Sequence, residues 1–361
     1  MKQLTSLFIA CVLSLFLISS CSKQKLSSAF ENEDKIYVIA DSLEFMQIQP
    51  ALDSVFQKVI YTPQPETTFF LQRKNFNELD NLKNFQNIII AAPLNSGSSV
   101  SSYLNSILDA KLKNSALSGT DESFSKDDLW TKDQLVIILT SKNIEGLSKN
   151  ILKNGPELYQ RFQKISDKKF YENLYNPEFE NKSIEAKFLK EYGWILNVQN
   201  DFSLVLDKPE DKFVWLRSMP KNDLAKWIFV HWIDNASPAF LNPDSIAKER
   251  NMLTKKYLKP AGSENFVKIT EEFKTTSDMN FHGNYALAMQ GLWEMSDKSM
   301  GGPFINYTQY DEKSKRIYMI DASVYAPNYI KKGLIRQLDI LLQSFQTTEQ
   351  VSDLRKKELL R

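Results

Sequence analysis

Three short apolar runs in the first half of the chain constrain its fold more than any other feature. They are KIYVIAD, QNIIIAAPL and DQLVIILTS, at residues 35–41, 86–94 and 133–141. Each run is apolar at nearly every position, which predicts a strand buried on both faces. A fourth strand is predicted at 67–73, and helices at 43–59, 75–83, 100–112 and 143–175. This alternation predicts an α/β domain over residues 35–180, with a mostly parallel sheet and helices on both faces.

Strands follow one another directly in the second half. They are predicted at 194–207, 211–220 and 226–234, and again at 285–295, 303–310 and 316–325. A helix is predicted at 245–258, then a loop-rich passage to residue 285, and a closing helix at 329–345. Because strands with short connections pair antiparallel, residues 185–346 are predicted to form an α+β domain, an antiparallel sheet with helices packed on one face. The charged residues 347–361 are predicted to be a frayed tail.

The N-terminus has the pattern of an export signal. Residues 1–20 carry one charge, Lys2, followed by an apolar run at 7–18. That run is too short to span a bilayer of ~30 Å and has the length of a signal-peptide core. The small residues before Cys21 resemble a lipobox, which predicts cleavage before Cys21 and a lipid anchor on its thiol. The alternative is an ordinary secretory signal with an incidental cysteine.

The residues after Cys21 predict where the anchored protein lies. Residues 21–34 are polar and are predicted to be a tether. Their first positions lack the acidic residues that would mark inner-membrane retention or surface export, so we expect an outer-membrane lipoprotein that faces the periplasm. The other cysteine, Cys11, lies in the signal, which leaves the mature chain no thiol for a disulfide, a metal or a nucleophile.

Charge and motifs exclude several classes of function. The formal charge of +1 falls to 0 when Lys2 is removed, so no nucleic-acid partner is expected. The motifs G-x-S-x-G, H-E-x-x-H, G-x-x-x-x-G-K-[ST] and G-x-G-x-x-G do not occur. We therefore assign no catalytic residue, no metal ligand and no cofactor. The two histidines cannot build a histidine-rich metal centre, and alternation places His231 on one face with Trp227 and Phe229, as a satisfied core or rim histidine. His282 is expected in a loop.

A Gly/Ser loop follows the second apolar run. Residues 92–104 read APLNSGSSVSSYL, so a buried strand ends, a loop turns and a helix begins. Loops at the carboxyl edge of a parallel sheet often bind ligands, and free N–H groups of Gly97, Ser98 and Ser99 could hold an anion. The simpler interpretation is that Ser98 or Ser99 caps the helix and Gly97 makes the turn.

The segment GLWEMSDKSMGGPFINY, residues 291–307, contains three of the 11 glycines of the chain. It predicts two strands joined by SDKSMGG, with glycines that permit positive φ and Pro303 at the start of the second strand. Its apolar and acidic residues suggest a contact surface for a partner. The candidate interface residues are Trp293, Glu294, Met300, Gly301, Gly302 and Phe304. The alternative is a packed hairpin with a buried Trp293 and with Glu294 paired to Arg316 or Lys298.

This segment also carries a resemblance. Together with residues 211–232, residues 323–345 and the helix that contains Lys248-Glu249-Arg250, it resembles the domain-of-unknown-function family numbered 4837. The resemblance is taken to cover nearly all of the mature chain. It implies an exported lipoprotein of Bacteroidota, and it implies no activity and no catalytic residues.

The leading hypothesis is therefore a non-enzymatic, lipid-anchored envelope protein that binds an envelope protein or ligand through its second domain. One alternative is a hydrolase of glycan or peptide that uses Glu294, Asp297 and Asp321, which would need two carboxylates about 5 to 10 Å apart across a cleft. Another is a lipid or small-ligand carrier, which would need an apolar cavity of ~300 Å³ or more.

Overall fold

The computed structural model describes residues 34–60, 62–120, 123–259 and 262–361. The predicted signal peptide, the predicted lipidation site Cys21 and nearly all of the predicted tether lie outside these residues. The described chain forms two compact units. The first runs to Gln49 and resumes from Gln72 to Lys153, and the second holds Pro50–Leu71 and Asn154–Arg361.

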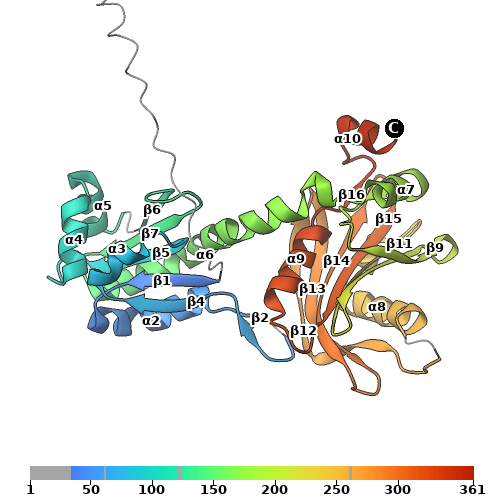
Figure 1. Ribbon diagram of the computed structural model, residues 1–361, viewed down its shortest axis with the longest axis horizontal. Coiled ribbons are helices and arrows are strands. Elements are labelled where there is room, and N and C mark those ends of the chain that lie inside the picture. The colour runs from blue at the N-terminus through green and yellow to red at the C-terminus, as the bar shows by residue number, and fades with distance from the viewer. Residues whose placement is uncertain (1–33, 61, 121–122, 260–261) are drawn as a thin grey trace, which may run out of the picture. The chain divides into compact units, whose positions relative to one another are not determined.

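The first unit contains a five-stranded sheet of order β4-β1-β5-β7-β6 (Figure 1). The strands are β4 (Phe70–Lys74), β1 (Lys35–Ile39), β5 (Asn87–Pro93), β7 (Leu135–Ser141) and β6 (Ser123–Asp127). β1, β5 and β7 pair in parallel, which confirms the predicted mostly parallel sheet, and β6 runs antiparallel to β7. β6 falls where a polar loop was predicted. It is an edge strand with mostly exposed side chains, so it has no apolar run to reveal it.

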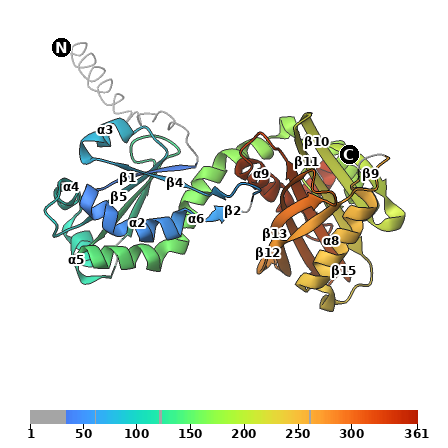
Figure 2. The ribbon, with the colours of Figure 1, turned by 90° about the horizontal axis from the view of Figure 1, so that it is seen from below.

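Helices cover both faces of this sheet. Every residue of β5 is buried, which requires cover on each side. The helices are α2 (Ser42–Phe56), which from Pro50 onward belongs to the second unit, α3 (Leu79–Leu82), α4 (Ser99–Ile107) and α5 (Ala110–Ser118). α3, α4 and α5 contribute side chains to one core with β1 and β5, and α2 lies on the side of the sheet opposite α3 (Figures 1 and 2). The long helix α6 (Ile144–Leu174) begins in this unit and ends in the second.

The second unit contains a seven-stranded sheet of order β12-β13-β14-β15-β11-β10-β9 in which neighbouring strands pair antiparallel. The strands are β9 (Ser203–Lys208), β10 (Phe213–Lys221), β11 (Leu224–Ile233), β12 (Val267–Phe281), β13 (Asn284–Met295), β14 (Gly301–Asp311) and β15 (Arg316–Tyr325). β9 to β11 form one meander and β12 to β15 a second, and the two join where β15 pairs with β11.

β12 corrects the sequence prediction, which placed a loop-rich passage there. This strand has 15 residues and forms one edge of the sheet. Most of its side chains are at least partly exposed, and its pairing with β13 shifts register between Ile269 and Lys274. A polar edge strand with an irregular register lacks the alternation by which strands are identified in a sequence.

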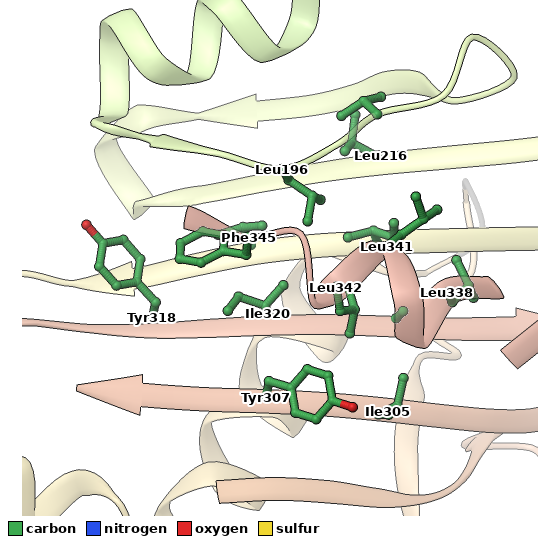
Figure 3. Packing of buried hydrophobic residues seen from close by; sticks show 14 of the residues in the cluster. Leu196, Leu216, Ile305, Tyr307, Tyr318, Ile320, Leu338, Leu341, Leu342 and Phe345 are labelled. Carbon is green, nitrogen blue, oxygen red and sulfur yellow. The ribbon is translucent and has the colours of Figure 1, made fainter. Parts of the chain in front are cut away.

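Two helices cover opposite faces of this sheet. Helix α9 (Lys332–Leu342) places Leu338, Leu341 and Leu342 against strand residues such as Ile320 (Figure 3). Helix α8 (Pro243–Tyr257) packs in a second core that includes Met319. Since consecutive residues of a strand point to opposite faces, α8 and α9 lie on different faces. The α+β class is confirmed, but helices on one face only were predicted.

The C-terminal residues are ordered, so the prediction of a frayed tail is wrong. β16 (Gln346–Thr347) pairs with β8 (Trp194–Ile195), and α10 (Asp353–Leu359) follows. Val351 and Leu359 are buried in a small core with α7 (Lys182–Tyr192). Charged residues lie between these two apolar positions, so the sequence pattern does not reveal this small core.

A short hairpin adds residues of the first half to the second unit. β2 (Val59–Ile60) pairs with β3 (Glu66–Thr67), and the Glu66 carboxylate accepts hydrogen bonds from the backbone N–H groups of Lys331 and Lys332, both at 2.9 Å. Glu66 thereby supplies acceptors to the N-terminus of α9, a position that favours a negative charge. This hairpin was predicted to belong to the first domain.

Candidate functional site

The predicted hairpin is present in the second unit. β13 and β14 pair antiparallel, with Trp293 opposite Gly302 and Glu294 opposite Gly301. Five residues, 296–300, connect the strands. The two strands lie inside the sheet and not at its edge, because β12 pairs with β13 and β15 with β14. The edges of both strands are therefore occupied. Within the segment 291–307 the exposed residues are 297–299, which lie in the connection at the tip of the hairpin, residues 294–301.

Main-chain hydrogen bonds close the tip. The N–H of Met295 donates to the carbonyl of Met300 at 2.9 Å, and the N–H of Lys298 donates to the carbonyl of Met295 at 2.8 Å. Lys298 has a φ of 60°, in the left-handed region. The positive φ predicted for the glycines thus belongs to Lys298, whereas Gly301 and Gly302 are part of the extended strand β14.

Two glycines of the segment allow neighbouring backbone atoms to lie very close to the hairpin. A Cβ atom on Gly302 would lie 1.9 Å from the carbonyl oxygen of Val324, and one on Gly291 would lie 2.2 Å from the carbonyl oxygen of Phe273. Both distances are far inside van der Waals contact, so neither position has room for a side chain. Gly291 faces the place where the register of β12 shifts.

Three of the predicted interface residues lie in the interior. Trp293 is 2% exposed, Phe304 is 1% exposed and Gly302 is buried. The indole N–H of Trp293 donates to the carbonyl of Val324 at 3.2 Å, and its ring lies 5.0 Å from that of Trp227. The interface prediction is therefore wrong for these three residues, which hold the hairpin in place and offer no surface to a partner. For them the alternative of a packed hairpin applies.

A buried ion pair lies beneath the hairpin. The Nε and Nη2 atoms of Arg250 in α8 donate to the two carboxylate oxygens of Asp321 in β15, at 2.7 and 3.2 Å. Nη2 also donates to Ser323 at 3.1 Å, and the amide of Asn306 donates to Asp321 at 3.0 Å. The guanidinium lies 3.9 Å from the ring centroid of Phe304. This bidentate arrangement fixes α8 on the sheet in one position.

Asp321 is enclosed and not open to a substrate. Both Asp321 and Arg250 are 0% exposed. Burial raises the pKa of Asp321, while the charge of Arg250 and hydrogen bonds from Asn306 and Ser323 stabilise its ionised form. Neither Arg250 nor Asn306 was predicted as a partner. A signal was present, since a single acid inside the apolar strand RIYMIDASVY needs a buried partner.

Glu294 is half-exposed at the tip and has a different partner from those predicted. Its carboxylate pairs with Lys268 of β12 at 3.1 Å. Arg316 pairs instead with Asp234 at 2.6 Å. Lys268 lies in β12, which the sequence predicts as a loop-rich passage, so this partner is not apparent before the strand pairing is known.

Asp297 organises the turn. It accepts hydrogen bonds from the N–H and the hydroxyl of Ser299, at 3.1 and 2.6 Å, and from the amide of Asn265 at 2.6 Å. These bonds, that from the Ser299 hydroxyl first, hold the pKa of Asp297 below its usual value. Next to it, Met300 is half-buried against the core under α8. The tip therefore presents Glu294, Asp297 and Met300 in one defined conformation.

Both histidines have partners. The Nδ1 atom of His231 lies 2.9 Å from the carbonyl oxygen of Lys212, and Nε2 lies 3.3 Å from Glu249. Nε2 of His282, in the turn between β12 and β13, lies 2.6 Å from the carbonyl oxygen of Gln343. Among the residues that the structure describes, no group of His, Cys, Asp and Glu is placed to hold a metal ion. No helix in the described ranges is long and apolar enough to cross a membrane.

The Gly97 loop lies in the first unit, between β5 and α4. Gly97 has a φ of 71°. The hydroxyl of Ser98 accepts a hydrogen bond from the N–H of Ser101 at 3.1 Å and donates to the carboxylate of Glu44 at 3.2 Å. Ser98 is thus the helix cap that the simpler interpretation described, and Ser99 is exposed beside it. The negative charge of Glu44 at this position opposes the binding of an anion.

Solved structures that resemble the chain differ widely from it in sequence. The Ran-binding protein Mog1p of Saccharomyces cerevisiae is 12% identical over 43% of this chain and 90% of its own, with a TM-score of 0.29. LpqN, involved in cell envelope biogenesis of Mycobacterium tuberculosis, is 10% identical over 42% of this chain and 82% of its own, with a TM-score of 0.28. Among curated proteins, none matches the chain by sequence.

Two family models match the chain. Residues 181–344 match the Domain of unknown function (DUF4837), and residues 29–175 match the Domain of unknown function (DUF8532). The resemblance seen in the second half is therefore confirmed there, whereas the first half matches a different family. The second half of the chain is therefore similar to the DUF4837 family, and the first half is similar to the DUF8532 family.

Proposed function

We propose that the protein is a lipid-anchored component of the bacterial envelope that acts as a non-enzymatic binding or assembly module. In this proposal, Cys21 carries the anchor in the outer membrane and the two units face the periplasm. The partner is another envelope protein, which contacts the tip of the β13–β14 hairpin. The lipobox-like residues before Cys21 support the location in the envelope, and the structure of the tip supports its role as the binding surface.

The hydrogen bonding that orders the tip is the observation that carries this function. Its turn is closed by main-chain hydrogen bonds and by Asp297, and its base is fixed by the buried Trp293. Glu294 and Met300 remain half-exposed above this base. A surface that is already ordered loses little conformational entropy on binding, so even a small contact can be specific.

The carboxylates considered for a hydrolase have other roles. Asp321 is buried against Arg250, Glu294 pairs with Lys268, and Asp297 holds the turn. The space between α9 and the sheet, where a carrier could keep an apolar ligand, is filled by side chains such as Phe345 (Figure 3). These contacts favour binding at the surface over either alternative.

Site-specific cross-linking in cells tests the proposal. A photoreactive amino acid replaces Met300 at the tip or, as a control, Met219, a methionine of β10 that is 50% exposed. We expect one envelope protein, identified by mass spectrometry, to be captured from position 300 and not from position 219. Equal capture from both positions, or none from position 300, would contradict a contact at the tip.

A charge substitution gives a second, independent measurement. Met300→Glu adds a negative charge beside Glu294 and Asp297 and should reduce binding of the captured partner by tenfold or more, on the order of 1.4 kcal/mol. Met219→Glu should leave the affinity unchanged. Circular dichroism and thermal unfolding of both variants show whether the fold is intact, and an intact Met300→Glu variant with full affinity would exclude the tip as the interface.

A further inference from the structure

A pocket opens in the first unit, away from the hairpin. Its volume is about 320 Å³, near the lower end of the range for small-molecule sites. Three segments line it: residues 40–41 after β1, residues 75–77 after β4, and residues 99–100 at the start of α4. Ser99, one of the predicted anion-site residues, is therefore part of a concave surface that it shares with two other loops.

The strand order explains why a pocket forms here. From β1 the chain moves outward to β4 and then returns past β1 to β5, as the order β4-β1-β5 shows. The connections after β1 and after β5 therefore leave in opposite directions. In open α/β sheets this arrangement leaves a crevice at the carboxyl ends of the strands, where ligands commonly bind.

One wall of the pocket is apolar. Phe76 contributes a half-buried aromatic ring, and the buried Ala40 and Val100 lie at the same wall. That ring packs against Tyr103, with 5.2 Å between ring centroids. A flat ligand with C–H groups on one face could pack against the ring of Phe76.

The other groups are hydrogen-bonding side chains. Asp41 lines the pocket and accepts one hydrogen bond from the N–H of Leu43 at 3.0 Å, which leaves acceptor capacity on its carboxylate. Asn77 and Ser99 are exposed where they line it. Arg73 donates to the carbonyl of Ala40 at 3.2 Å and to the side-chain oxygen of Asn75 at 2.9 Å, and so ties two of the lining segments together.

The charges select the kind of ligand. Asp41 lines the pocket, and the carboxylate of Glu44 already accepts a hydrogen bond at the start of α4. These two carboxylates repel an anion, and the guanidinium of Arg73 beside them is already hydrogen-bonded to Ala40 and Asn75. Amides, a hydroxyl and a carboxylate next to an aromatic ring instead suit a neutral ligand that has many hydroxyl groups and one apolar face.

We propose that this pocket binds a single neutral sugar ring. The apolar face of the ring lies on Phe76, and Asp41, Asn77 and Ser99 hydrogen bond to its hydroxyl groups. The inference is independent of the contact proposed for the hairpin, which lies in the other unit. It replaces the anion predicted for Gly97, Ser98 and Ser99 by an uncharged ligand.

Ligand-observed NMR on the purified full-length protein tests this proposal, in a zwitterionic detergent that has no sugar head group. The probes are glucose, galactose, mannose, N-acetylglucosamine and, as the anion, inorganic phosphate. We expect saturable binding of at least one sugar that phosphate does not displace. Binding of none of the four sugars, or displacement by phosphate, would overturn the proposal.

Two substitutions locate the site. Asn77→Ala removes a hydrogen-bonding amide from the pocket, and Asp41→Asn replaces a charged acceptor by a neutral amide with only one acceptor oxygen. Each should weaken binding of the sugar that binds the wild type by about tenfold. Asparagine can still cap α2, so Asp41→Asn should fold normally. The matched control is Asn114→Ala, at an exposed position of α5 in the same unit. Unchanged affinity in both pocket variants, or equal loss in the control, would show that the sugar binds elsewhere.

Discussion

The indole N–H of Trp293 donates a hydrogen bond to the carbonyl of Val324 at 3.2 Å, and Gly302 lies against both groups. A Cβ atom at position 302 would be 1.9 Å from that carbonyl oxygen and 3.1 Å from the indole nitrogen. The absence of a side chain at Gly302 thus permits the hydrogen bond that anchors the hairpin.

Gly302→Ala should therefore destabilise the second unit. The added methyl group must push Val324 or Trp293 away, and overpacking of this kind costs about 2–3 kcal/mol. Urea unfolding followed by tryptophan fluorescence measures the change. Gly333→Ala is the control, because Gly333 lies in α9, where an added methyl group would have no atom within 4 Å, and this variant should gain up to about 1 kcal/mol.

Arg250→Met should destabilise the protein more strongly. The substitution leaves Asp321 buried without its cation, which costs about 3–5 kcal/mol. The double variant Arg250→Met/Asp321→Leu removes both charges and should recover a large part of this loss. Chemical denaturation of the Arg250→Met, Asp321→Leu and double variants gives the coupling energy. If the double variant loses as much stability as the two single variants together, the pair has no specific coupling.

Glu185 should make stability depend on pH near neutrality. Burial raises its pKa to about 7, although Arg355 lies 2.6 Å away and Val198 donates a backbone hydrogen bond at 2.9 Å. Between about pH 4.5 and 7 the folded state then holds a proton that the unfolded chain releases, so stability falls as the pH rises through this window. Glu185→Gln should remove this fall, which amounts to about 2–3 kcal/mol.

Glu358→Gln is the matched control, because Glu358 also pairs with Arg355. It is exposed, and the hydrogen bond from Lys182 first, then that from Arg355, lowers its pKa to about 2. Its contribution is complete above about pH 4.5 and is lost only at lower pH, so this variant should differ from the wild type by a constant amount between pH 5 and 8. If the unfolding free energies of both variants depend on pH in the same way across this range, Glu185 is not the group responsible for the fall.

Glu66→Ala should loosen the start of α9. The substitution removes the acceptors of the N–H groups of Lys331 and Lys332 and should cost about 1–2 kcal/mol. Hydrogen exchange at these two amides should accelerate, whereas Glu272→Ala on the exposed part of β12 should leave them unchanged. Equal protection in both variants would mean that Glu66 does not hold the helix.

Burial decided which elements could be predicted from the sequence. β5 and β7 are nearly continuous apolar runs, because a parallel sheet covered on both faces leaves its central strands no polar side. The hairpin of β13 and β14 was also predicted, since turn residues separate two strand patterns. By contrast, β12 and α10 are half-exposed and rich in charge, so tertiary contacts identify them and local pattern does not.

The candidate site was harder to predict for a related reason. The tip residues could be named, but whether Trp293 points into the core or out of it depends on which strands flank the hairpin. The partner of Glu294 is Lys268, 26 positions away in β12 by their numbers and opposite it in the register. The role of Gly302 depends on the carbonyl of Val324 in a third strand, and a turn pattern contains no information about that strand.

The second unit is discontinuous in sequence, and this has a consequence for how such proteins can evolve. Residues 50–71 belong to it, although the family match of the second half begins only at residue 181. A recombination breakpoint near residue 180 would separate α9 from Glu66, and Arg336 from its ion-pair partner Asp167. Recombination that joins a second half to a different first half should therefore be disfavoured, and the two domains should be inherited together.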